Sequence, residues 1–203
     1  MNTTASEWFM LTPAGALHAF AQPQPEETEL TLQALLMGER ALDAAAWAEK
    51  ASAAASVLGS ALEQGWVQRL QRPLQGPDAK LDDFLPHVIA SLSGERRAVL
   101  ASEAGFCLGR VGVDQTEAET LSVAAVDYSG FAERQARRGW VGASRYVSFH
   151  NDPEFLLPSY SFIPFWVDGT GYWLIVGGEP LLNNPALVEL MWGIKEAGTR
   201  FAM

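Results

Sequence analysis

The stretch that most constrains the fold is Ser161–Gly178, SFIPFWVDGTGYWLIVGG, in which two apolar runs flank a turn of sequence DGTG. Residues of that kind tolerate positive φ angles, so the stretch predicts a β-hairpin. Apolar residues occupy successive positions in both runs, so neither face of the hairpin is polar. We therefore expect both faces to be covered, one of them by a second subunit in one interpretation.

Length and composition place the chain among globular proteins. Its 203 residues are 48% hydrophobic, enough for one large domain or two small ones. The sequence has no apolar run of roughly 18 residues, and the amino-terminal MNTTASEW lacks the pattern of a secretory signal, so we expect no membrane insertion. The single cysteine and the net charge of −10 favour an acidic, cytoplasmic protein that is not attracted to phosphate backbones or anionic lipid.

The amino-terminal part reads as mostly helical. Residues 6–20 suggest a tight hairpin around Thr12-Pro13-Ala14-Gly15, or a strand leading into a loop. Helices are expected over residues 26–37, 40–50 and 56–64, with Gly65 as a left-handed cap before a strand at 66–70. This order is typical of a winged helix-turn-helix unit, and VLGSALEQGWVQRL resembles the third helix of that family running into its wing. We assign residues 1–72 to a winged-helix-like domain.

Residues 73–80 contain prolines and a glycine without apolar periodicity and are predicted to form a linker to a second domain at 81–203. There the patterns predict a helix from Asp82 or Asp83, a hairpin over 97–111 and a long helix capped by Asp114 or Thr116. A strand at 146–149, the opening hairpin and a helix from Asn184 to Gly198 complete the order.

The long helix is apolar on two sides. One stripe contains Leu121, Ala125, Tyr128 and Ala132, whereas Val123, Ala124 and Phe131 lie roughly opposite. We expect such a helix to be covered on both sides, on one by its own sheet and on the other by a second surface such as a partner helix. The alternative is a helix buried inside a larger monomer.

Three features stand out from residue 81 onward: the hairpin AVLASEAGFCLGRVGV, the Ala- and Leu-rich helix after it, and the late pair SFIPFWV and GYWLIVGG closed by NPALVELMWGIK. In this order they resemble the roadblock/dynein light chain family. The resemblance implies an α+β fold: a profilin-like α/β/α sandwich whose five-stranded antiparallel sheet has two helices on one face and the long helix on the other. The smaller, mostly helical winged-helix-like domain precedes it.

The resemblance further implies a non-enzymatic, homodimeric scaffold or regulatory protein. Its partner would be a small Ras-like GTPase or a component of a signalling or motility assembly. Family members dimerise through the long helix and the third strand, which here gives an interface of Leu121, Val123, Ala124, Ala125, Tyr128, Phe131, Tyr146 and Phe149. Exposed cations are the candidate partner-binding residues: Arg69, Arg72, Arg137 and Arg138.

No grouping of residues predicts an active site, a metal site or a cofactor. Cys107 lies in a predicted strand without a CxxC partner, and a buried structural thiol explains it better than a nucleophile. His18, His87 and His150 are far apart in sequence and lack metal-ligand spacing. The pair Gly177-Gly178 is followed by Glu and Pro, which does not fit a phosphate-binding loop.

A transcriptional regulator with a DNA-binding winged helix and a dimerisation or sensing domain is the alternative function. Residues 1–78 carry four basic residues and nine carboxylates, a net charge near −5 (4 − 9), and the would-be recognition helix has no Lys or Arg. DNA binding requires several cations on one face, so charge argues against nucleic acid as a partner.

We therefore expect no retention of duplex DNA in a mobility-shift assay, even at low salt where phosphate contacts are strongest. Salt-sensitive, sequence-selective retention would instead favour the regulator.

Overall fold

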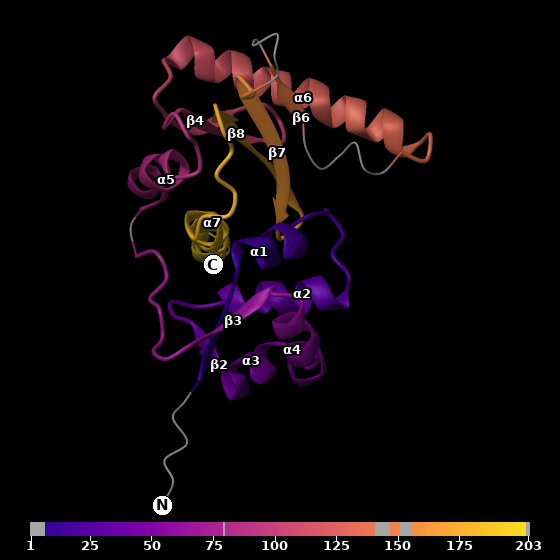
Figure 1. Cartoon of the computed structure of the whole chain (residues 1–203), viewed down its shortest axis with the longest axis vertical. Coiled ribbons are helices and arrows are strands. Elements are labelled where there is room, and N and C mark those ends of the chain that lie inside the picture. The colour runs from indigo at the N-terminus through magenta and orange to yellow at the C-terminus, as the bar shows by residue number, and fades with distance from the viewer. Residues whose placement is uncertain (1–6, 79, 141–146, 151–155, 202–203) are drawn as a thin grey trace, which may run out of the picture.

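The computed structural model describes residues 7–78, 80–140, 147–150 and 156–201 (Figure 1). The amino-terminal elements are β1 (Trp8–Leu11), α1 (Pro13–Ala19), α2 (Glu27–Gln33), the 3₁₀ helix η1 (Ala34–Leu36), β2 (Leu42–Asp43), α3 (Ala44–Lys50), α4 (Ala54–Glu63) and β3 (Val67–Leu70). The remaining elements are α5 (Leu81–Ala90), β4 (Ala98–Ser102), β5 (Cys107–Val111), α6 (Gln115–Ala136), β6 (Val147–Phe149), β7 (Tyr160–Val167), β8 (Thr170–Gly177) and α7 (Ala186–Phe201).

The larger sheet has five antiparallel strands in the order β5-β4-β8-β7-β6. Buried residues of α5 and α7 share one core with one face of this sheet, and buried residues of α6 form a second core on the other face. Figure 1 shows these layers in the upper half of the molecule. The α+β class, the five-stranded antiparallel sheet and the distribution of helices over its faces are confirmed.

The β7–β8 hairpin is apolar on both faces and covered on both. Its register pairs Phe162 with Ile175 on the side of α6, and Ile163 with Leu174 on the side of α7. All four side chains are at most 3% exposed. The interpretation that a second subunit covers one face of the hairpin is therefore wrong, because the chain's own α6 covers it.

The amino-terminal elements form a second sheet in the order β2-β1-β3, flanked by helices (Figure 1). Of the two alternatives for residues 6–20, the hairpin around Thr12 is wrong, and the strand is present as β1 but leads into α1 and not into a loop. Thr12 accepts a hydrogen bond from the backbone N–H of Gly15 at 3.0 Å, and Pro13 occupies the first helical turn, where its missing N–H costs nothing.

The predicted wing differs from the structure. Gly65 has φ +68 and ends α4 as expected, and β3 follows it. However, β3 pairs with β1, which precedes all the helices, and in the described part of the chain it forms no hairpin with a strand after it. The winged-helix interpretation is therefore not confirmed.

Several element boundaries also differ. Residues 42–43 form β2 and α3 starts only at Ala44, because the Asp43 side chain accepts a hydrogen bond from the Ala46 N–H at 2.9 Å and fixes the helix start there. The carboxyl-terminal helix continues past Gly198 to Phe201, since one glycine costs a helix only about 1 kcal/mol. Tyr146, expected in a strand, lies outside the described residues.

One apolar core extends across the proposed domain boundary, because buried residues of β1, α1 and η1 belong to the same cluster as those of α5 and α7. Trp192 of α7 donates a hydrogen bond to the carbonyl of Gly38 at 2.9 Å, and Glu196 accepts one from the Gly38 N–H at 2.8 Å. The proposed linker is attached to this junction through a bridge between Gln75 and Arg40. The division at residues 73–80 stays a prediction.

The helix α1 lies in close contact with the residue before β3. A Cβ atom added to Gly15 would lie 1.9 Å from the carbonyl oxygen of Trp66, well inside van der Waals contact. That oxygen accepts a hydrogen bond from the Thr12 N–H at 2.9 Å, so it cannot move without breaking the junction.

We expect Gly15→Ala to lower the free energy of unfolding by about 1–3 kcal/mol, because the added methyl group forces α1 away from Trp66. Gly59→Ala is the matched control: nothing lies within 4 Å of its added Cβ on α4, so a gain of about 0.5–1 kcal/mol is expected. Urea unfolding measures both changes. Equal stabilisation by the two substitutions would contradict the close contact.

Candidate functional site

The long helix α6 is the centre of the candidate site. Asp114 caps it by accepting a hydrogen bond from the Glu117 N–H at 2.8 Å, and its 22 residues cross one face of the sheet. Its inner side buries Ala118, Ser122 and Ala125 completely. Small residues at these positions allow the helix to lie close to the strands.

The outer side of α6 exposes three large apolar side chains around Asp127. Val123 is 60% exposed, Phe131 41% and Val126 38%. Within the described part of the chain, no other element covers these exposed portions of the three side chains. Exposed branched and aromatic side chains on a helix whose other face is already packed are typical of a protein interface.

The predicted interface residues divide between the two sides of α6. Ala125 is fully buried, and Leu121 packs on the core between α6 and the sheet. The assignment of Ala124 to the opposite side is wrong, because Ala124 packs on the same core. Tyr128 also points inward, with its ring centroid 4.8 Å from that of Phe162 and 5.5 Å from that of Phe149. The remaining predicted residues that offer surface are Val123, Phe131 and Phe149, which is 43% exposed. Tyr146 lies outside the described residues.

Two exposed apolar residues near this surface are not among the predicted interface residues: Val126 on α6 itself and Phe106. Phe106 follows Gly105, which adopts φ +84 in the turn between β4 and β5, and it is 70% exposed. The turn touches α6, because a Cβ added to Gly105 would lie 2.7 Å from a methyl carbon of Val126. Phe106 is therefore an exposed aromatic residue in the turn that contacts α6. An aromatic residue beside a turn glycine was the available signal.

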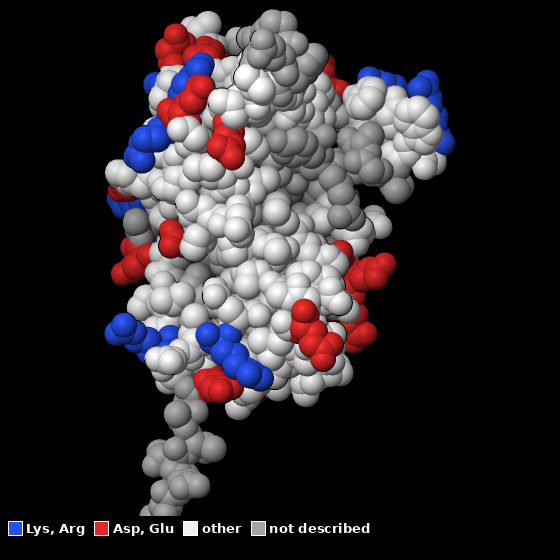
Figure 2. Space-filling view, viewed as in Figure 1, with Lys and Arg blue, Asp and Glu red and all other residues white. Residues whose placement is uncertain are grey.

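The charges on the outer side of α6 are unequally distributed. Glu119 is exposed near the start of the helix, whereas Arg134, Arg137 and Arg138 are exposed at its end. Figure 2 shows Lys and Arg side chains gathered at that end, at the upper right. Arg137 makes a weak ion pair with Glu133 at 3.6 Å.

The other two candidate arginines belong to a different part of the molecule. Arg69 lies on β3, where it makes an exposed ion pair with Glu7 at 3.5 Å, and Arg72 follows the same strand and is exposed. Because β3 and the end of α6 lie far apart in the fold, the four arginines do not form one patch (Figure 1).

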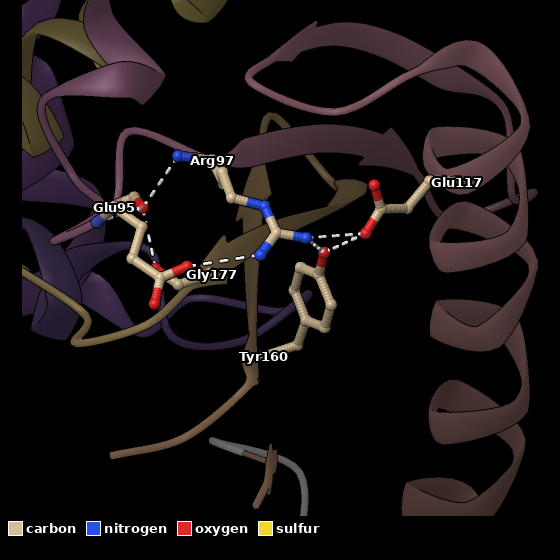
Figure 3. A network of polar contacts seen from close by, with 6 residues as sticks. Glu95, Arg97, Glu117, Tyr160 and Gly177 are labelled. Atoms are coloured by element: carbon tan, nitrogen blue, oxygen red, sulfur yellow. Dashed lines mark hydrogen bonds and ion pairs between the residues drawn. The ribbon is translucent and has the colours of Figure 1, made fainter. Parts of the chain in front are cut away.

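A polar network joins the start of α6 to the sheet (Figure 3). Arg97 lies directly before β4. Its guanidinium donates hydrogen bonds to Glu117 at 2.8 Å, to Glu95 at 3.2 Å and to the Tyr160 hydroxyl. Tyr160 in turn donates to Glu117. Burial, together with that hydrogen bond, raises the pKa of Tyr160 to about 12. The phenol therefore stays protonated at neutral pH and acts as a donor that positions α6, not as a base.

Among the described residues, the remaining reactive groups are not grouped as a metal site, and the thiol is not activated. Burial raises the pKa of the Cys107 thiol, which disfavours the thiolate needed for nucleophilic attack or metal binding. In the ranges that the structure describes, no three or more His, Cys, Asp or Glu side chains are grouped as metal ligands. Within the same ranges, no helix is both long and apolar enough to cross a membrane.

Comparisons with known proteins gave one structural likeness. No family model matches the chain, and no curated protein matches it. The crystal structure of a roadblock/LC7 domain from Streptomyces avermitilis aligns with 61% of this chain and 98% of that chain, at 21% sequence identity and a TM-score of 0.39.

The network makes a testable prediction about Tyr160. Glu117→Gln removes the negative charge and leaves a neutral, weaker acceptor, so Tyr160 should ionise at lower pH than in the wild type, though still above pH 10 because burial is the largest cause. Ultraviolet titration of tyrosinate measures this shift, and Tyr160→Phe identifies the signal. An unchanged titration in Glu117→Gln would contradict the hydrogen bond.

The same shift predicts how stability depends on pH. The pKa of Tyr160 in the folded protein lies above the unfolded value of about 10. Its contribution to stability is therefore fully present below about pH 10 and is lost as the pH rises toward about 12. Urea unfolding at several alkaline pH values should show a smaller loss for Tyr160→Phe than for the wild type.

Proposed function

We propose that this protein is a non-enzymatic, cytoplasmic regulator or scaffold that forms a homodimer through α6 and binds a protein partner. The segment from residue 81 onward would be a roadblock-like domain, with the amino-terminal unit packed on its α7 side. A small Ras-like GTPase, or a component of a signalling or motility assembly, is the partner that the resemblance implies.

The observation that carries this proposal is the exposed apolar side of α6. The inner side of the helix already packs on its own sheet, so Val123, Val126 and Phe131 are free to contact another molecule. Together with Phe106 they supply the aromatic and branched side chains that form the centres of protein interfaces.

The charges on α6 favour a second copy as the occupant of this surface. Glu119 lies seven residues before Val126, and Arg134 lies seven residues after Asp127. In an antiparallel pair of α6 helices centred between Val126 and Asp127, each Glu119 faces the partner's Arg134 about 11 Å from the centre. Glu119 and Arg134 are therefore complementary between the two copies, and each exposed Asp127 faces the partner's Val126 next to the centre.

Val123→Glu should convert the dimer into a monomer, because two carboxylates would be placed in an apolar interface. Light scattering at micromolar protein concentration measures the mass. Leu30→Glu is the matched control, since Leu30 is 53% exposed on α2, away from α6, and should leave the dimer intact. A wild-type monomer at this concentration would refute the dimer.

The charge pairing has its own test. Glu119→Arg by itself creates two pairs of like charges across the dimer interface, and so does Arg134→Glu by itself. Each single variant should therefore weaken the dimer by about tenfold or more at low salt. The double variant restores both pairs and should recover most of the affinity. Failure of the double variant to recover, with both single variants folded, would exclude the antiparallel register.

A further inference from the structure

A second candidate surface lies on the opposite side of the sheet from α6. It is a groove between the β1–β3 strands, the segment after β3 and the start of α7, and we name it the α7 groove. Its volume is about 110 Å³. Three parts of the chain that are far apart in sequence meet there: residues 10–13, 68–75 and 185–192.

The floor of the α7 groove is apolar and rigid. Met10, Leu11, Val188 and Trp192 line it and are each at most 5% exposed. Trp192 is fixed by its hydrogen bond to Gly38, so the floor cannot easily close. A cavity of about 150 Å³ accommodates a benzene molecule. The α7 groove is smaller, which suits one aliphatic side chain.

The rim of the groove is polar and already ordered. Gln68, Gln75 and Glu189 are exposed around it and offer amide and carboxylate groups to the backbone or side chains of a bound peptide. The segment that carries Gln75 is held in place because Leu74 accepts a hydrogen bond from the Ala41 N–H at 2.8 Å. A preformed rim reduces the entropic cost of binding.

Charge selects among possible peptides. Glu189 is the charged residue that lines the groove, and the whole chain carries a net charge of −10. An acidic peptide would therefore be repelled, whereas a Lys or Arg next to the inserted side chain could pair with Glu189.

We propose that the α7 groove binds an extended segment of a partner protein, inserting one leucine- or isoleucine-sized side chain with a neighbouring Lys or Arg on Glu189. This inference rests on the proposed role in binding a protein partner and names the chemistry of that partner. It does not depend on the dimer, because the groove lies on the α7 side of the sheet and the apolar surface of α6 lies on the other.

The test uses the full-length protein labelled with ¹³C on its methionine methyl groups. Met10 in the groove floor reports binding, and Met37, which is 40% exposed and does not line the groove, is the internal control. Three capped pentapeptides serve as probes, with the sequences GKLRG, GELEG and GKSRG. We expect GKLRG to shift the Met10 resonance, and the other two to bind about tenfold more weakly or not at all.

Variants at the exposed rim assign the effect to the groove. Gln68→Trp fills it and should abolish the Met10 shift, whereas Gln68→Ala should retain it. Glu189→Lys should transfer the preference from GKLRG to GELEG. Glu49→Lys, an equal charge change on α3, should not.

Three outcomes would overturn the proposal: no shift of Met10 by any peptide, equal binding of GELEG and GKLRG to the wild type, or an equal shift by leucine amide alone, which would indicate a small-molecule site. Val123→Glu should keep the peptide response. If Val123→Glu is a monomer that still binds the peptide, the dimer proposal and the groove proposal can be tested independently of each other.

Discussion

The β7–β8 hairpin has two apolar faces, and the need to bury both of them is the constraint on which the other elements depend. Ile163 and Leu174 need a cover on one side, and Phe162 and Ile175 need one on the other. Each such side chain contributes about 1.5–3 kcal/mol when buried. The helices α5 and α7 supply one cover and α6 supplies the other, so the hairpin becomes the middle layer of a three-layer unit.

The helix α7 connects this unit to the amino-terminal elements. One side of α7 packs on the sheet, and the Trp192 indole and the Glu196 carboxylate both bond the backbone of Gly38. The helix therefore belongs to two packing layers at once. The same arrangement leaves the α7 groove open at the start of the helix and leaves α6, on the far side, with one uncovered face.

The layers of the carboxyl-terminal half could be predicted because local patterns specify them: an apolar hairpin with a turn that tolerates positive φ, and a helix capped by Asp114. The amino-terminal half was less predictable. The Thr12-Pro13 pair is compatible with a turn or with a helix start, and only the hydrogen bond to Gly15 decides between them. The pairing of β3 with β1 joins residues more than fifty positions apart, which no local pattern encodes.

The sequence alone determined that α6 has two apolar sides, because helical periodicity assigns each residue to a side. It did not determine which side is exposed. The tertiary structure decided that Ala125 and Tyr128 face the sheet while Val123 stays uncovered, and it placed the turn at Gly105, which precedes Phe106, against Val126. The α7 groove also exists only in the folded chain, because its walls come from three segments that are distant in sequence. The physical reason is that exposure depends on which neighbours pack against a residue, and those contacts are made between parts of the chain remote in sequence.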